Sequence, residues 1–260
     1  MTMKTTHVNG AITAISLVGL IVFWTVLAWL KSDPDVLPMP AEVWRIMRAE
    51  AASGDLAYHM MATIRRVVAA FALAMFLGLV IGIALGRYRA LDRWLGVWLV
   101  VFLNIPALVV IVLCYLWIGL NEVAAITAVA LNKTAMVAVS IREGTRALDP
   151  KLRDMARSFE LSPLQNLRHV VLPQLWPFIA SSTRNGLAII WKIVLVVEFL
   201  GRSNGIGFQI HLYFQLFEIG YVMAYALSFV AFVLILEWTV IALFERRATR
   251  WRLEGQGEAG

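Results

Sequence analysis

Long uncharged stretches recur along the chain and restrict what it can fold into. The first runs from Ala11 to Leu30 without Asp, Glu, Lys or Arg, and further apolar blocks follow it. About 20 apolar residues in a helix cross the hydrocarbon core of a bilayer. With 60% hydrophobic and 15% charged residues, the composition also lies outside the usual range of soluble domains. The sequence therefore predicts an all-α integral membrane protein.

Six apolar blocks are long enough to be spans, within one transmembrane domain that covers residues 1–260. The first block is interpreted as an uncleaved span, because it is long and no Ala-x-Ala cleavage site closes it. The third contains Asn104 and Pro106, and a proline in mid-span leaves one backbone carbonyl without its helix donor. The predicted spans are residues 11–30, 67–86, 94–120, 123–141, 175–200 and 219–244.

Positive charge is unevenly distributed among the segments that separate these spans. If the N-terminus is inside, the inner segments hold more than twice as many Lys and Arg residues as the outer ones. Cytoplasmic segments of membrane proteins carry such an excess. We therefore expect both termini and the segment 142–174 in the cytoplasm. The net charge of +6 then reflects orientation in a lipid bilayer, and no nucleic-acid partner is expected.

Small residues recur at four-residue steps through the second predicted span. They are Ala70, Ala74, Gly78, Gly82 and Gly86. Small residues on one face of a membrane helix let a neighbouring helix approach closely. We expect this face to lie against another helix.

The segment 142–174 is a polar island with two helix starts. Asp149 and Pro150 are typical of an N-cap followed by a first-turn proline. Ser162 and Gln165 have the spacing of a capping box. Apolar residues fall on one face of each predicted helix, and Pro173 interrupts the second. Two short amphipathic helices joined by a turn form a knob that suits a groove on another protein.

This segment resembles the EAA loop of permease subunits from bacterial ABC importers, whose pattern is E-A-A, three residues, G, nine residues and I-x-L-P. Asp154-Met155-Ala156 stands for E-A-A, Glu160 for the glycine, and Val170, Leu172 and Pro173 for I-x-L-P. Three further features are similar to the nitrate, sulfonate and taurine permease group. They are the order of the apolar blocks, the stretch LPMPAEVW after the first block, and the stretch VVEFLGRSNGIGF after the fifth.

The resemblance implies a type I importer permease fold and an ATPase docked on the cytoplasmic loop. Glycine in place of Glu160 would permit a left-handed turn, whereas a glutamate there costs about 1 kcal/mol. Phe159 and Met155 suit the role of docking anchors. The docking residues expected are Leu152, Asp154, Met155, Ala156, Phe159, Glu160 and Ser162.

The resemblance also implies the partners. They are two ATPase subunits, a second permease subunit that forms a homodimer, and an extracytoplasmic substrate-binding protein, all at a bacterial inner membrane. The chain has no G-x-x-x-x-G-K-[S/T] motif, so ATP and Mg²⁺ are expected on the ATPase and no cofactor on this chain. Cys114 is the only cysteine and the four histidines are scattered, so neither a catalytic cluster nor a metal site is expected.

Polar residues inside the spans are candidates for the solute path, because a charge within the membrane is costly. Asn104, Asn132, Lys133 and Lys192 would attract a small anion, such as a sulfonate, taurine or nitrate, if they face one cavity. The alternative is structural pairing, for example of Lys192 or Arg184 with Glu198. Lys192 and Glu198 are six residues apart, which does not suit pairing within one helix.

Two other classes of function compete with an ABC importer permease. An ion-gradient-driven secondary transporter would use the charges within the spans as a proton or sodium site. The sequence has no evident inverted repeat, and the cytoplasmic knob has no role in that scheme. A membrane enzyme would need a catalytic cluster, which the sequence lacks.

Overall fold

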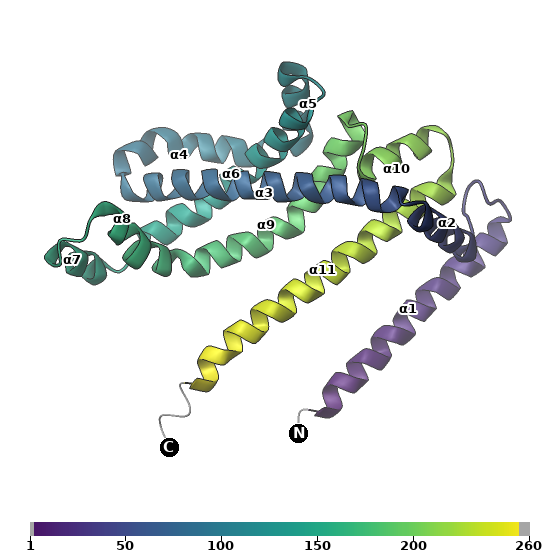
Figure 1. Cartoon of the computed structure of the whole chain (residues 1–260), viewed down its shortest axis with the longest axis horizontal. Helices are drawn as coiled ribbons and strands as arrows, with labels where there is room; N and C mark the ends of the chain where they lie inside the picture. The colour runs from purple at the N-terminus through teal and green to yellow at the C-terminus, as the bar shows by residue number, and fades with distance from the viewer. Residues whose placement is uncertain (1–2, 255–260) are drawn as a thin grey trace. The chain divides into compact units, whose positions relative to one another are not determined.

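The computed structural model describes the backbone of residues 3–254 and the side chains of residues 12–236 apart from Ala14. The side chains of the basic residues near both ends of the chain lie outside the described residues. The same holds for the side chains of the predicted sixth span beyond residue 236. All regular structure in the described part is helical, so the predicted all-α class is confirmed (Figure 1). The elements are α1 (Met3–Lys31), α2 (Pro40–Ser53), α3 (Asp55–Arg87), α4 (Arg89–Asn104), α5 (Ala107–Ile118), α6 (Glu122–Arg146), α7 (Pro150–Ser158), α8 (Pro163–Asn166), the π-helical turn η1 (Leu167–Val171), α9 (Leu172–Gly201), α10 (Ile206–Gln215) and α11 (Ile219–Glu254).

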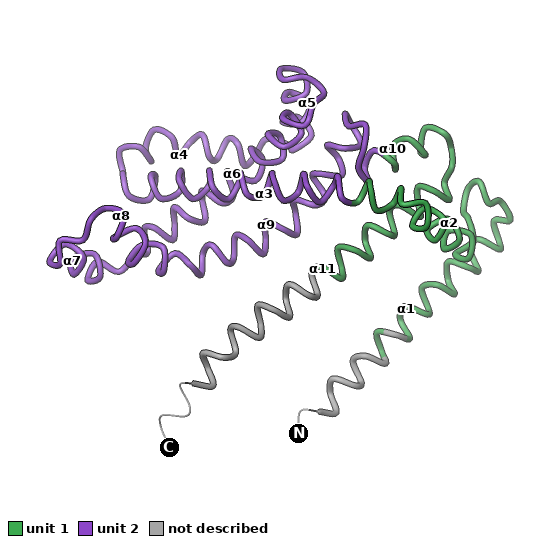
Figure 2. The backbone as a smooth tube through the Cα atoms, in the orientation of Figure 1, with its two compact units in different colours: residues 1–60, 209–260 green, residues 61–208 purple. Residues whose placement is uncertain are grey.

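The chain divides into two compact units, which are described separately (Figure 2). The first comprises the described parts of residues 1–60 and 209–260, and the second comprises residues 61–208. In the first unit the ring of Tyr213 stacks on that of Tyr221 at a centroid distance of 4.4 Å, and the Tyr225 hydroxyl donates to Glu50. The second unit contains α7 and α8 and most of the polar residues singled out from the sequence.

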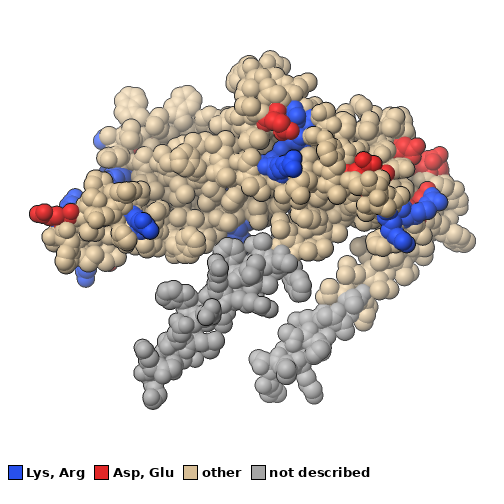
Figure 3. Space-filling model, viewed as in Figure 1, with Lys and Arg blue, Asp and Glu red and all other residues tan. Residues whose placement is uncertain are grey.

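Three described helices are long and apolar enough to cross a membrane. They are α3, α6 and the part of α11 from Ile219 to Leu236. The apolar part of α1 described here, Ile15–Lys31, is shorter. Helix α9 has 30 residues, carries Arg184, Lys192 and Glu198, and is not one of these three helices. Outside the grey segments, most of the face drawn in Figure 3 carries no charged residue, as a lipid-facing surface requires.

The third predicted span is broken. Helix α4 ends at Asn104, α5 begins at Ala107, and the two axes are bent by 101°. Ile105 between them has an extended backbone, φ −73° and ψ 125°, because the residue before a proline is disfavoured in the helical region. The two helices form either one broken span or a re-entrant loop.

Helix α6 is the centre of the second unit and contacts α4, α5 and α9. Its face toward these neighbours is rich in alanine, including Ala124, Ala128 and Ala138. The small-residue face of α3 also lies against α6, as predicted. Ala70 and Ala74 are buried, and a Cβ added at Gly78 or Gly82 would meet Val137 or Ile141 of α6. Leucine-sized side chains at these positions would force the two helices apart.

Candidate functional site

The first helix of the segment 142–174 begins as the sequence predicts. The side chain of Asp149 accepts a hydrogen bond from the Lys151 backbone N–H at 2.8 Å, and Pro150 occupies the first turn of α7. Before α8, Ser162 and Gln165 form both hydrogen bonds of the predicted capping box. We call α7, α8 and the turn between them, residues 150–166, the hairpin.

The turn of the hairpin is left-handed at Glu160, where φ is +49°. The Leu161 N–H donates to the Ala156 carbonyl and the Glu160 N–H donates to the Arg157 carbonyl, both at 3.0 Å. This pair of bonds is a Schellman motif, which usually has glycine at the left-handed position. The chain therefore keeps the geometry for which glycine is suited, with a glutamate that costs about 1 kcal/mol more.

Large apolar side chains are exposed on the hairpin. Phe159 is 75% exposed, and Leu152 and Met155 are about half as exposed. Leu164 of α8 is 73% exposed and was not among the predicted docking residues. Ala156 is one of the predicted docking residues, but it is only 3% exposed. It lies inside the hairpin and is not available as a surface contact. Asp154, Glu160 and Ser162 are exposed. An exposed apolar surface bordered by charge is typical of a protein interaction site.

The base of the hairpin is anchored in the apolar core of the second unit. Val171 and Leu175 are buried against Val137 and Ile141 of α6, with Leu148 and Leu167 packed around them. The prediction that Pro173 interrupts the second helix is wrong, because the chain stays helical from Pro163 through η1 into α9. The π-helical turn before Pro173 accommodates the missing proline N–H. The hairpin and α9 are thus joined by continuous helix (Figure 1).

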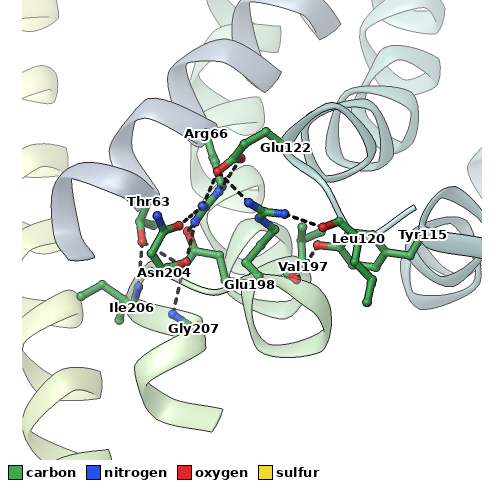
Figure 4. A network of polar contacts seen from close by, with 11 residues as sticks. Thr63, Arg66, Tyr115, Leu120, Glu122, Val197, Glu198, Asn204, Ile206 and Gly207 are labelled. Carbon is green, nitrogen blue, oxygen red and sulfur yellow. Dashed lines mark hydrogen bonds and ion pairs between the residues drawn. The ribbon is translucent and has the colours of Figure 1, made fainter. Parts of the chain in front are cut away.

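A buried ion network lies in the same unit (Figure 4). Arg66 of α3 forms a bidentate pair with Glu122 of α6, at 2.6 and 2.8 Å, and a 2.6 Å bond to Glu198 of α9. Its two remaining donors bind the carbonyl and side-chain oxygens of Asn204. All five guanidinium N–H groups are therefore used, which is the full donor capacity of arginine.

Glu198 is fully buried and is also satisfied. Its carboxylate accepts hydrogen bonds from the Thr63 hydroxyl and from the Gly207 backbone N–H, each at 2.9 Å, besides the bond from Arg66. The glycine-rich segment Gly201–Gly207 folds around this carboxylate. Gly205 has a φ of +110°, and a Cβ there would overlap the Glu198 carboxylate. A side chain at Gly207 would meet the Leu195 carbonyl oxygen. The glycines are required by this close approach.

The network was not foreseen from the sequence. The predicted second span began at residue 67, so Arg66 was assigned to an outer segment, whereas α3 begins at Asp55 and contains it. Glu198 was noted as a charge within a span, but its partner is Arg66 and neither Lys192 nor Arg184. One signal in the sequence pointed to this pair. Arg66 stands directly before one apolar block and Glu198 lies inside another, and charges within membranes are usually paired.

The four residues predicted to line a solute path lie in different environments. Lys133 is buried in α6, 2% exposed, and its ammonium group donates to the Met136 sulfur at 2.9 Å. Lys192 is exposed on α9, and Asn132 is half-buried beside Lys133. Asn104 is exposed at the end of α4 and donates to the Val100 carbonyl. In the described part of the chain, no hydrogen bond or ion pair joins these four side chains to one another.

A second ion cluster lies at the other end of α6. Asp92 of α4 pairs with Arg142 at 3.2 Å and with Arg146. The two clusters therefore fix both ends of α6 to its neighbours: Glu122 at the first residue, and Arg142 with Arg146 in the last two turns.

Comparisons with known proteins agree on one family. A family model described as "binding-protein-dependent transport system inner membrane component" matches residues 74–250. A protein of Bacillus subtilis named as an aliphatic sulfonates transport permease is 32% identical over 92% of this chain and 86% of its own length. A taurine transport system permease protein of Escherichia coli is 27% identical over 91% of this chain and 88% of its own length.

A solved structure shares the fold. One chain of a crystal structure of an amino acid ABC transporter with histidines superposes with a TM-score of 0.59. The match covers 77% of this chain and 97% of that chain at 22% sequence identity.

Proposed function

Since the chain belongs to the family of binding-protein-dependent transport system inner membrane components, we propose that it docks an ATPase subunit on the hairpin and conducts a small anionic solute. As a permease subunit of an ABC importer, it is a transport component. Its family membership excludes the alternative of an ion-gradient-driven secondary transporter. The docking site and the solute are the parts that the proposal adds.

Docking on the hairpin is supported by one observation above the others. Phe159 and Leu164 are among the most exposed apolar side chains of the described chain, and they stand on a segment whose base is anchored in the core. Aromatic anchors that become desolvated at the centre of an interface commonly carry much of the binding energy. The half-exposed Leu152 and Met155 extend this apolar surface, with Asp154, Glu160 and Ser162 at its polar border.

The proposed topology places the hairpin in the cytoplasm, at a bacterial inner membrane. Six spans are proposed, formed by α1, α3, the α4–α5 pair, α6, α9 and α11, with both termini cytoplasmic. The excess of Lys and Arg in the segments assigned to the inside supports this orientation. Of the three charged residues of α9, Glu198 is paired with Arg66, as charges within a membrane usually are.

The solute class is proposed from two sources. Two relatives are named for transport of aliphatic sulfonates and of taurine, which carry an anionic sulfonate group. Lys133 is buried, and the structure gives it a thioether as hydrogen-bond partner rather than a carboxylate. Among residues 12–236, whose side chains the structure describes, no carboxylate pairs with Lys133, and a buried cation of this kind favours an anion. Asn104, Asn132 and Lys192 complete the proposed path.

The mechanism follows from the anchored hairpin. ATP would bind and close a pair of ATPase subunits, with ATP and Mg²⁺ held on those subunits. The hairpin would move with them, and α6 and α9 would transmit that motion as a rigid body. A second copy of this chain would form the other half of the path, and an extracytoplasmic binding protein would deliver the solute. ATP must favour one arrangement over the other for this scheme to work.

Purification of the intact importer tests the proposal. The full chain, carrying an affinity tag, is isolated in mild detergent from the native membrane, and the copurifying proteins are identified by mass spectrometry. We expect an ATPase with a phosphate-binding loop in equimolar amount. Its absence, with the chain monodisperse and folded, would contradict the proposal.

A further inference from the structure

Gln174, which follows the hairpin in the chain, is hydrogen-bonded to Asp149, the residue directly before the hairpin. Its side-chain oxygen accepts a hydrogen bond from the Asp149 backbone N–H, and its side-chain nitrogen donates to the Val170 carbonyl, both at 2.9 Å. Asp149 is the N-cap of α7, where the hairpin begins, and Gln174 lies in the first turn of α9, where the chain returns. One side chain therefore joins residues 25 positions apart at the base of the hairpin.

A side-chain amide suits the chemistry of these two bonds. The Asp149 N–H can only donate and the Val170 carbonyl can only accept, so the partner must offer both functions at once. This also fixes the orientation of the amide, because the reverse orientation would place donor against donor. A methionine of similar length would make neither bond.

The position of Gln174 coincides with an irregular turn. In η1 the Leu172 N–H donates to the Leu167 carbonyl, five residues back, and Pro173 supplies no N–H. Single π-helical turns within α-helices frequently occur at functional sites. Here the turn lies between the hairpin and α9, and the Gln174 side chain bonds a carbonyl within it. Without that bond and the bond to Asp149, the apolar contacts of Leu148 and Leu167 would remain to hold the angle of the hairpin.

We propose that Gln174 is a positioning residue that holds the hairpin at a fixed angle to α9, so that motion of a docked ATPase reaches this helix. The inference rests on the proposed docking of an ATPase at the hairpin. Loss of Gln174 would leave the docking surface in place, because its two side-chain hydrogen bonds go to Asp149 and Val170 and to none of the exposed apolar residues of the hairpin. Docking would persist while the transmitted motion is lost.

Distance measurement within the importer tests this role. Spin labels are attached to cysteines at Lys151 on α7 and Asn185 on α9, both exposed, in a Cys114→Ser background. The complex with its ATPase is assembled with labelled copies diluted by unlabelled ones, and the label distance is measured by double electron–electron resonance. We expect one narrow distribution that is the same without nucleotide and with ATP trapped. Gln174→Met should broaden it, whereas the control Gln215→Met, on α10, should not.

A second pair of variants isolates the hydrogen bond from Asp149. Its φ of −63° is compatible with proline, which removes the N–H. Asp149→Ala removes only the side-chain cap, so we expect a narrow distribution, whereas Asp149→Pro should broaden it. A narrow distribution in both Gln174→Met and Asp149→Pro, with the ATPase retained, would overturn the role of Gln174 alone. A native complex that retains no ATPase would overturn the docking proposal and this role with it.

Discussion

The guanidinium of Arg66 and the carboxylate of Glu198, 132 residues apart in sequence, lie 2.6 Å apart in the folded chain. Both side chains are almost completely enclosed, with exposures of 4% and 0%. Glu122 and the Asn204 segment share the same guanidinium, so one arginine connects α3, α6, α9 and the loop after α9. An arginine is suited to this position because its donors are planar, fixed and always charged.

Arg66→Met should destabilise the chain strongly. Removing one partner of a buried ion pair leaves an uncompensated charge, at a cost of about 3–5 kcal/mol. Thermal unfolding of the purified chain in detergent measures the loss. Arg65→Met is the matched control, since Arg65 is the exposed neighbour on the same helix.

The double variant Arg66→Met/Glu198→Gln should be more stable than Arg66→Met alone. Glutamine removes the unpaired charge and can still accept from Thr63 and Gly207. Equal melting temperatures for Arg66→Met and Arg65→Met would contradict a structural role for the network.

The glycine face of α3 predicts an assembly defect. Gly78→Leu with Gly82→Leu should prevent α3 from approaching α6, because even a Cβ at either position would overlap α6 side chains. The yield of monodisperse chain after detergent extraction is the measurement. Gly19→Leu on α1, where an added Cβ meets nothing within 4 Å, should extract normally. Normal yield of the double variant would show that the two helices tolerate separation.

The orientation of the hairpin can be tested by labelling. Single cysteines are placed at Arg45 on α2 and Arg157 on α7, whose side chains are 79% and 75% exposed, in a Cys114→Ser background. A membrane-impermeant maleimide added to cells with a permeabilised outer membrane should label Arg45→Cys and spare Arg157→Cys until the inner membrane is opened. The reverse pattern would place the hairpin outside and remove any contact with a cytoplasmic ATPase.

Lys133→Met should reduce the uptake of an anionic solute. Loss of a charged contact to the sulfonate group costs about 2 kcal/mol or more, so uptake of labelled taurine should fall by about 30-fold or more. Copurification of the ATPase should be unchanged, and Lys31→Met, exposed at the end of α1, is the control. Lost expression would indicate a structural role, and normal uptake would exclude Lys133 from the path.

Local patterns made the hairpin predictable from the sequence. The caps at Asp149 and Ser162 depend on residues within three positions, and both form as expected. The spacing of Gly78 and Gly82 similarly predicted a helix contact, although the partner helix was not identifiable. Each of these signals is contained in one or two helical turns, where spacing determines which side chains meet.

The sequence did not predict which residues far apart in the chain would pair. The partner of Glu198 could not be chosen among several cations, because the choice depends on how α3 and α9 pack. The burial of Ala156 and the continuous helix through Pro173 were also missed. The left-handed turn at Glu160 matches the glycine position of the EAA pattern, but the π-helical turn at Leu167–Val171, which carries the helix through Pro173, has no simple residue pattern.

Measuring the affinity of the ATPase for the Phe159→Ala variant tests the docking claim most directly. The chain is reconstituted in nanodiscs and titrated with its purified ATPase, with Phe214→Ala, exposed on α10, as the matched control. The account predicts a loss of about 2 kcal/mol or more, a rise of about 30-fold in Kd, for Phe159→Ala and no change for Phe214→Ala. An unchanged Kd for Phe159→Ala, with only a lower melting temperature, would contradict it.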